Sequence, residues 1–324
     1  MKNFKTIFRT MLMVTLVLTT SCEISDDVDI IHTPASAQAF KSVRDAALEN
    51  HTQTFNFNAE DGNVTLISDN GVQININGNC LTLNGTAVTG NVDIKYVELF
   101  DKGSMLTTNK PTMGEMPNGD KALLISGGEF FIEATQNGDY LDTNCGLQLI
   151  IPSDLTGGAD TTMTLWEGRI NEDEDLTWDE VDLVTGQGGV FVEGEQYYSS
   201  LESFGWSNVD RFYSDPRPKT QIQVQAPIGY NDLNSDVYLS YDGEDVGLAQ
   251  LDTYDGTLNL FSEHYGQIPI GLECHVIFAT EDNGIWRYAI KAVTIVADDI
   301  ITFTLDQTTI GTEASLVTLI NGLP

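Results

Sequence analysis

The sequence predicts an all-β protein built from two antiparallel β-sandwich domains. Apolar and polar side chains alternate with period two in many short segments after residue 52, which is the pattern of half-buried strands. Asn-Gly and Asp-Gly pairs separate several of these segments and favour tight hairpin turns. The segment Asp215–Pro218 carries two prolines, which stiffen the backbone and favour a linker. We therefore expect one sandwich at residues 53–218 and a second at 219–324.

The N-terminal segment, residues 1–22, has the features of an export signal and is left out of the fold prediction. Lys2, Lys5 and Arg9 form a basic start, and the apolar run Met11–Leu18 follows. This run is too short for a permanent membrane-spanning helix, which needs roughly 20 residues. An apolar run that ends in small residues and a cysteine resembles the lipobox of bacterial lipoproteins. That resemblance implies cleavage before Cys22 and lipidation of Cys22; an ordinary secretory signal is the alternative.

Residues 23–52 are predicted to form an acidic tether. Four carboxylates lie within residues 23–29, directly after the predicted anchor. This resembles the acidic export tag that sends lipoproteins of Bacteroidetes to the cell surface, although a solvated tether is an equal alternative. The segment Ala35–Asn50 has helical spacing at Phe40, Val43 and Ala47, so a short helix is expected there. These features predict an outer membrane lipoprotein at the cell surface or, failing that, facing the periplasm.

The net charge is strongly negative and restricts the classes of partner. The chain carries 15 Lys and Arg against 48 Asp and Glu. Without residues 1–22 the balance is 12 basic against 48 acidic side chains, or −36 with neutral histidine. Nucleic acid and anionic lipid are polyanions, so both are disfavoured as partners. The hydrophobic fraction of 41% is high enough to build a core and argues against disorder.

The first predicted sandwich contains eight short strands and a less regular extension. The predicted strands are Thr54–Asn58, Asn63–Ser68, Val72–Ile76, Cys80–Leu83, Val92–Leu99, Ala122–Ile125, Glu129–Ala134 and Leu147–Ile151. Residues 153–218 are less regular and include an acidic run, Asn171–Asp182, and an aromatic segment, Tyr197–Tyr213. The strand spacing is typical of an antiparallel sandwich.

The second predicted sandwich follows the proline-rich linker. Its predicted strands are Gln221–Gln225, Asp236–Tyr241, Thr257–Phe261, Glu273–Ala279, Trp286–Val296 and Ile300–Leu305. The two predicted sandwiches show no convincing internal repeat.

Three cysteines remain after Cys22, namely Cys80, Cys145 and Cys274. In an oxidising compartment they permit one disulfide and one free thiol. Cys80 and Cys145 are candidates to pair within the first sandwich, and the pairing is left open. Cys274 lies in an apolar stretch and is expected to be a buried thiol.

The segment Gly62–Pro152 resembles uncharacterised Bacteroidetes surface lipoproteins with a ZU5-like or Ig-like β-sandwich. The resemblance is carried by VTGNVDIKYVELFDKGSML (88–106), LLISGGEFFIEA (123–134) and LQLIIP (147–152), together with SFGWSNVDRFYSDP (203–216). It implies Ig-like sandwiches and a surface or assembly module. It carries over no catalytic residue.

The motifs of common catalytic and metal sites are missing from the sequence. The four histidines show no HExxH spacing and no GxSxG elbow occurs, so we predict no enzyme. No resident cofactor is expected, with calcium as the alternative reading of two acidic groups. The first group is Glu172–Asp175 with Asp179–Asp182. The second group is Asp232, Asp236, Asp242, Gly243, Glu244 and Asp245.

One aromatic segment is a candidate ligand surface. Trp206 lies near Asn208, Asp210 and Arg211, and a sugar ring can stack on an indole beside polar groups. Packing of Trp206 in a core or between domains is the favoured interpretation, and the ligand surface is the alternative. The favoured function is a non-enzymatic, lipid-anchored module that contacts another envelope protein or helps to assemble an extracellular structure. Binding of a polysaccharide through Trp206 and its neighbours is the alternative, and hydrolase chemistry is a third.

Overall fold

The computed structural model describes residues 32–171, 176–181 and 189–324 of the 324-residue chain. Contacts within the chain separate Met1–Thr33 from Pro34–Pro324. The predicted signal segment and Cys22 lie outside the described residues. None of the described helices is both long and apolar enough to cross a bilayer.

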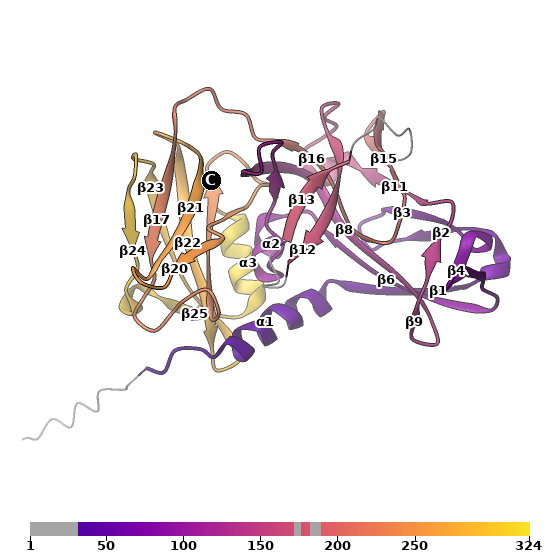
Figure 1. Cartoon of the computed structure of the whole chain (residues 1–324), viewed down its shortest axis with the longest axis horizontal. Helices are drawn as coiled ribbons and strands as arrows, with labels where there is room; N and C mark the ends of the chain where they lie inside the picture. The colour runs from indigo at the N-terminus through magenta and orange to yellow at the C-terminus, as the bar shows by residue number, and fades with distance from the viewer. Residues whose placement is uncertain (1–31, 172–175, 182–188) are drawn as a thin grey trace, which may run out of the picture. The chain divides into compact units, whose positions relative to one another are not determined.

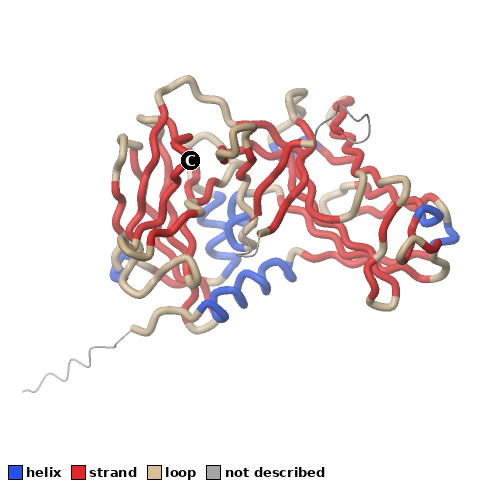
Figure 2. The backbone as a smooth tube through the Cα atoms, viewed as in Figure 1, coloured by secondary structure: helices blue, strands red, loops and turns tan. Residues whose placement is uncertain are grey.

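The largest sheet, sheet A, contains a small closed barrel (Figures 1 and 2). Its strands run in the order β1 (Thr52–Asn58), β6 (Asn91–Leu99), β8 (Lys121–Gln136), β16 (Gly205–Phe212), β12 (Thr164–Ile170), β13 (Leu176–Glu180) and β7 (Met113–Glu115). Because β7 also pairs with β8, the last five strands form a ring. The short β9 (Asp139–Tyr140) extends β8 through the Asn-Gly turn at 137–138.

Aromatic side chains fill the barrel. Trp166 and Trp178 are fully buried with Leu124 and Leu176 in one apolar cluster. Each indole N–H donates to a carbonyl, from Trp166 to that of Asp210 at 3.0 Å and from Trp178 to that of Pro111 at 3.0 Å. Large aromatic rings contribute most to such cores, and a buried indole needs a partner for its N–H.

Two further sheets complete the N-terminal half. Sheet B has the order β14 (Gly189–Glu193), β15 (Gln196–Leu201), β11 (Leu147–Pro152), β3 (Gln73–Asn77) and β2 (Asn63–Ile67). Sheet C contains β10 (Asp142–Thr143), β4 (Leu81–Leu83) and β5 (Thr86–Ala87). Cys80 and Cys145 form a disulfide with a Cα–Cα distance of 5.9 Å, which resolves the pairing that the sequence left open.

Residues 219–311 form two sheets that share a buried apolar core. Sheet D has the order β20 (Thr253–Asp255), β21 (Leu260–Pro269), β17 (Lys219–Gln225) and β24 (Ile300–Thr302). Sheet E has the order β19 (Ala249–Gln250), β18 (Ser235–Tyr241), β22 (Glu273–Asp282), β23 (Ile285–Thr294) and β25 (Thr309–Gly311). Cys274 is a buried free thiol on β22, as predicted.

Three α-helices contribute to a second apolar cluster. They are α1 (Ala37–Asn50), α2 (Lys102–Thr107) and α3 (Glu313–Asn321). Phe40 of α1 meets the Trp286 ring edge-on at 6.1 Å, and Leu316 and Ile320 of α3 are buried in the same cluster. The helix predicted in Ala35–Asn50 is therefore confirmed. It packs on the folded body, so this part of the chain differs from the expected tether.

The all-β prediction is confirmed at the level of a mostly β fold with several sheets. The closed barrel was not predicted, and the two Ig-like sandwiches stay a prediction. Contacts cross the predicted boundary near residue 218, such as the 2.7 Å ion pair between Lys121 and Asp252. That boundary also stays a prediction.

Candidate functional site

The outer face of sheet B is the candidate binding surface. Successive side chains of a strand point to opposite faces, and on β3, β11 and β15 the buried residues alternate with less buried ones. Leu149 and Tyr197, for example, are fully buried beneath the sheet. The intervening side chains therefore form one continuous outer face.

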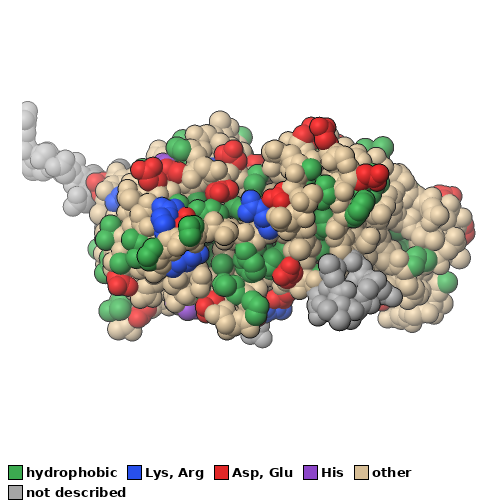
Figure 3. Space-filling model, turned by 90° about the horizontal axis from the view of Figure 1, so that it is seen from above, with side chains coloured by type: hydrophobic (Ala, Val, Ile, Leu, Met, Phe, Trp, Pro, Cys, Tyr) green, Lys and Arg blue, Asp and Glu red, His purple; other side chains and the backbone are tan. Residues whose placement is uncertain are grey.

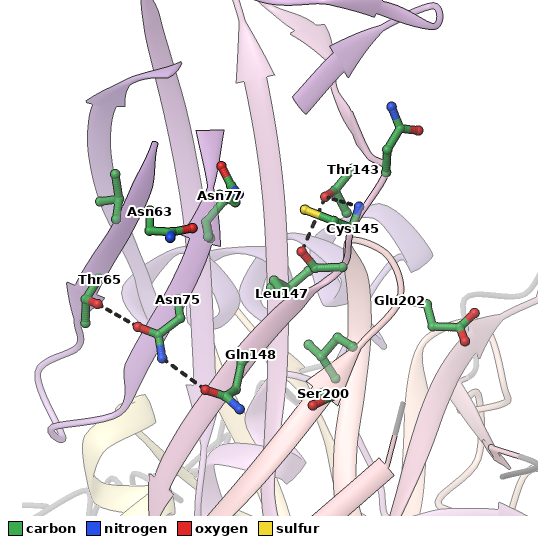
Figure 4. A pocket seen from close by; sticks show the side chains of 15 residues that line it. Asn63, Thr65, Asn75, Asn77, Thr143, Cys145, Leu147, Gln148, Ser200 and Glu202 are labelled. Carbon is green, nitrogen blue, oxygen red and sulfur yellow. Dashed lines mark hydrogen bonds between the residues drawn. The ribbon is translucent and has the colours of Figure 1, made fainter. Parts of the chain in front are cut away.

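A polar row crosses four strands of this face. The register places Ser200 of β15 opposite Gln148 of β11, Gln148 opposite Asn75 of β3, and Asn75 opposite Thr65 of β2. Thr65 Oγ1 donates to Asn75 Oδ1 at 2.6 Å, and Asn75 Nδ2 donates to Gln148 Oε1 at 3.4 Å (Figure 4). Neighbouring strands lie about 4.8 Å apart, so the row offers one polar group per strand at nearly regular spacing.

An aromatic and apolar row lies next to the polar row. Phe191 of β14 faces Tyr198 of β15, and Tyr198 faces Ile150 of β11. The two rings are 6.4 Å apart with an interplanar angle of 56°. Phe191 is 63% exposed. An exposed ring of this kind can accept a flat apolar surface, such as one face of a sugar ring.

A groove of about 970 Å³ runs along the polar row and beyond it. Asn63, Asn77 and Asn144 extend its polar lining, and Glu202 closes one side. Figure 4 shows amide and hydroxyl side chains from several strands around this space. A groove of this size is in the range that proteins use for small ligands or for a segment of a polymer.

The groove has far less charge than the protein as a whole. Among the described residues, Glu202 is the charged side chain in its lining, whereas the chain carries a net charge of −33. Amides offer both donors and acceptors, and hydroxyls adapt to either role. For Gln148 Nε2 and Ser200 Oγ, the described part of the chain offers no hydrogen-bond partner, so both are available to a ligand.

A buried carboxylate fixes the hairpin that carries one side of the groove. Glu98 on β6 is almost fully buried and accepts from Ser68 Oγ at 2.7 Å and from Tyr96 Oη at 3.0 Å. Its other oxygen accepts from Asn70 Nδ2 at 2.9 Å and from Gln53 Nε2 at 3.0 Å. Ser68 and Asn70 lie in the turn between β2 and β3, so this network ties the turn to sheet A.

The disulfide fixes the other end of the groove. Cys145 lies in the lining and is bonded to Cys80, which directly precedes β4. The cross-link holds the turn that leads into β11, where Gln148 is located. The groove is therefore built on two constrained turns and a regular sheet.

Two of the four residues of the ligand surface predicted from the sequence are buried. Asn208 and Asp210 are fully buried on β16, where Asn208 Nδ2 donates to Asp210 Oδ2 at 2.6 Å. Burial raises the pKa of the Asp210 carboxyl well above its ordinary value. Neither side chain can reach a dissolved glycan, because β16 lies between β8 and β12 in the barrel wall.

Trp206 and Arg211 are half-buried and already have partners. The Trp206 ring lies 5.2 Å from that of Phe131, and Lys110 Nζ lies 5.4 Å above the indole. Arg211 Nε donates to Asp160 Oδ2 at 2.7 Å. Trp206 therefore packs against its neighbours, which is the interpretation that the sequence favoured.

The acidic groups considered for calcium are dispersed. Residues 172–175 and Asp182 lie outside the described residues, while Asp179 pairs with Arg169 at 3.0 Å. In the second group, Asp236 pairs with Arg44 at 3.0 Å and Asp242 with His275 at 2.8 Å. Across the described ranges, no group of three or more His, Cys, Asp or Glu side chains is placed to hold a metal ion. The face seen in Figure 3 likewise shows acidic side chains that are scattered.

One histidine has a geometry that superficially resembles a catalytic relay. His264 Nδ1 lies 2.7 Å from Thr253 Oγ1 and 3.9 Å from Asp252 Oδ1. A relay uses one ring nitrogen for the nucleophile and the other for the acid. Because both neighbours approach the same nitrogen, this arrangement does not form a triad.

No protein-family model matches the chain, and no curated protein shows significant similarity to it. The resemblance to surface lipoproteins therefore stays a prediction.

The groove residues were not predicted, because they form no aromatic cluster in the sequence. A signal was present in the segments QININ and LQLIIP, where amides alternate with aliphatic residues. Alternation of this kind places every amide on the exposed side of its strand.

Proposed function

We propose that the chain is a non-enzymatic envelope protein that binds a neutral polysaccharide on the outer face of sheet B. The observation that carries this proposal is the polar row from Ser200 to Thr65 beside the exposed ring of Phe191 and the half-buried ring of Tyr198. Sugars present many hydroxyl groups around apolar C–H faces. A row of amides next to aromatic rings offers partners for both parts.

The same face is less suited to a protein partner. The cores of protein–protein interfaces are apolar, with large anchors surrounded by a polar rim. Here amide and hydroxyl side chains contribute much of the groove lining, and the rings of Phe191 and Tyr198 lie in the neighbouring row of the same sheet. This supports the polysaccharide function over the assembly module that the sequence favoured, which remains a prediction.

Charge supports a neutral rather than an acidic ligand. Glu202 lies in the groove, and the described part of the chain contributes neither Arg nor Lys to the groove lining. An acidic polymer would also meet the field of a strongly negative protein. A neutral glycan experiences no such repulsion.

The N-terminal sequence supports a location in the bacterial envelope. The basic start, the short apolar run and Cys22 favour export and lipidation, and two or three acyl chains give stable anchoring. The proposal therefore includes an outer membrane lipoprotein, with the acidic residues after Cys22 favouring the cell surface.

The test is retention of residues 23–324 in native gels that contain neutral polysaccharides, compared with a double variant. Asn75→Ala with Gln148→Ala removes two side chains at the centre of the polar row. Loss of two hydrogen-bonding groups at roughly 1 kcal/mol each predicts a loss in affinity on the order of 10- to 100-fold.

A matched control makes the same chemical changes elsewhere. Asn56→Ala with Gln221→Ala alters exposed side chains on β1 and β17 and should leave retention unchanged. Equal melting temperatures of all three proteins would show that folding is intact. The proposal is refuted if no neutral polysaccharide retains the native protein, or if the two double variants bind equally well.

A further inference from the structure

Three exposed apolar side chains lie at the loop tips of one end of sheets D and E. Ile228 is 100% exposed, Leu233 is 66% exposed and Leu258 is 56% exposed. Ile228 and Leu233 belong to the loop that joins β17 to β18, and Leu258 belongs to the turn between β20 and β21. Large apolar side chains concentrated at loop tips are unfavourable in water and indicate a contact.

The strand register places these two loops at the same end. β17 ends at Gln225, which pairs with Leu260 at the start of β21. The loop 226–234 therefore begins beside the point where the turn 256–259 ends. The next strand, β18, starts at Ser235 in sheet E, so the loop crosses from one sheet to the other at this end.

The chain enters the folded unit at this loop. Asn234 Nδ2 donates to the Ala35 carbonyl at 2.9 Å. Pro34 lies so close to Gly229 that a Cβ added there would be 2.5 Å from Pro34 Cγ, and Gly229 has a φ of +92°. Glycine is thus required at 229 for both conformation and space.

Covalent geometry limits the distance from this point to the proposed anchor. Pro34 follows Cys22 by twelve positions in the sequence. A fully extended segment of that length reaches at most about 43 Å. The connection from the folded unit to the proposed anchor therefore starts at the end that carries Ile228, Leu233 and Leu258.

We propose that Ile228, Leu233 and Leu258 insert into the lipid surface to which the protein is anchored. The inference rests on the proposed lipidation of Cys22. Once the protein is anchored, insertion is an intramolecular event with a high effective concentration, so three side chains suffice to orient the body. Without the anchor the same contact is weak.

The charges at this end determine the type of lipid surface. Asp232 and Asp255 lie beside the apolar tips in the sequence, and burial together with the negative charges of these two residues raises the pKa of Tyr254 on β20. Carboxylates are repelled by anionic headgroups. The surface that fits is therefore one of zwitterionic headgroups.

The experiment replaces the anchor, so that its result does not depend on whether Cys22 is lipidated. Residues 23–324 contain the whole folded unit Pro34–Pro324 and receive an N-terminal hexahistidine tag. The tag attaches the protein to phosphatidylcholine vesicles that contain a nickel-chelating lipid. A polarity-sensitive fluorophore on Leu258→Cys reports insertion, and the matched control carries it on Ile67→Cys, which replaces a 63% exposed side chain of sheet B.

On attachment we expect at least a twofold rise in emission with a blue shift at position 258, and no change at position 67. Adding Ile228→Ser and Leu233→Ser should abolish the response. Phosphatidylglycerol should reduce it at low salt, with recovery at high salt. An unchanged signal at 258 in attached protein, or equal changes at both positions, would overturn the inference. Retention by polysaccharide gels is measured on the same unlabelled protein, so failure of the glycan proposal is recognised separately.

Discussion

Glu263 makes the stability of this protein depend on pH in an unusual direction. It lies buried on β21, where its carboxyl accepts from the backbone N–H groups of Gly266 and Gln267, each at 3.1 Å. Burial raises its pKa to about 7 despite these bonds, and the negative charges of Asp252 and Asp120 add to the effect. The folded state therefore holds a proton that the unfolded chain releases near pH 4.5.

A carboxyl whose pKa is raised by folding contributes stability that is fully present below its pKa in the unfolded chain. This stability is lost as the pH rises through its pKa in the folded protein. Each pH unit between 4.5 and about 7 removes about 1.4 kcal/mol, or about 3 kcal/mol in total. Between pH 5 and 8.5 the expected loss from this group is about 2.5 kcal/mol. Glu263→Gln removes the titration and keeps the shape of the side chain.

The assay is urea-induced unfolding of both proteins at pH 5 and at pH 8.5. The free energy of unfolding of the native protein should fall by about 2.5 kcal/mol more than that of Glu263→Gln over this interval. Carboxyls that do not interact with Glu263 affect both proteins alike, so the difference reports Glu263 together with its coupling to Asp252 and Asp120. Parallel pH profiles of the two proteins would refute the reasoning.

Three further predictions concern stability. Glu98→Ala leaves several buried donors unsatisfied and should lower the free energy of unfolding by about 3–5 kcal/mol in urea titrations. Glu98→Gln should lower the free energy of unfolding by less. Equal losses in the two variants would contradict a stabilising role of the Glu98 hydrogen bonds. Replacing both Cys80 and Cys145 by serine opens a loop with a sequence separation of 65, so chemical unfolding should show a loss of about 4 kcal/mol, which reducing agent reproduces in the native protein alone. Glu129 is fully buried, and neither of its carboxyl oxygens has a partner among the described residues, so Glu129→Met should raise the stability at pH 8 by about 1–3 kcal/mol. A lower melting temperature of this variant in calorimetry would contradict the prediction and would show that the Glu129 carboxyl stabilises the fold.

Short strands with regular alternation were predictable, and strands interrupted by glycine were not. The predicted strand Leu147–Ile151 agrees with β11 within one residue. In contrast, two predicted strands, Ala122–Ile125 and Glu129–Ala134, form the single strand β8, because Gly127 and Gly128 make a bulge rather than a turn. A Cβ at Gly127 would lie 2.9 Å from the Val209 carbonyl, so only the neighbouring strand reveals why glycine is needed there.

The barrel could not be predicted because its closure depends on distant pairings. β12 and β13 lie in the stretch that looked irregular, and β7 is three residues long. β7 closes the ring by pairing with β8 on one side and with β13 on the other. Its sequence alone indicates neither partner.

The candidate site was predictable in the direction of its side chains but not in its assembly. Alternation places Asn75 and Gln148 on outer faces, yet it cannot show that these two faces are the same. They meet because β3 pairs with β11 across 73 positions of sequence. The same alternation is interrupted around Asp210, where β16 meets the bulge of β8, so the segment with the strongest aromatic signal became buried.

The two proposed contacts use different sheets, and this separation makes them compatible. The groove is built on sheet B, and the apolar loop tips belong to sheets D and E, which share no strand with it among the described residues. Within the unit Pro34–Pro324, Figure 1 shows β2, β11 and β15 on the opposite side from β17, β20 and β24. A lipid surface at the loop tips therefore leaves the polar row open to solution. Insertion of Ile228 and its neighbours would orient the groove away from the membrane, where a soluble polysaccharide can reach it.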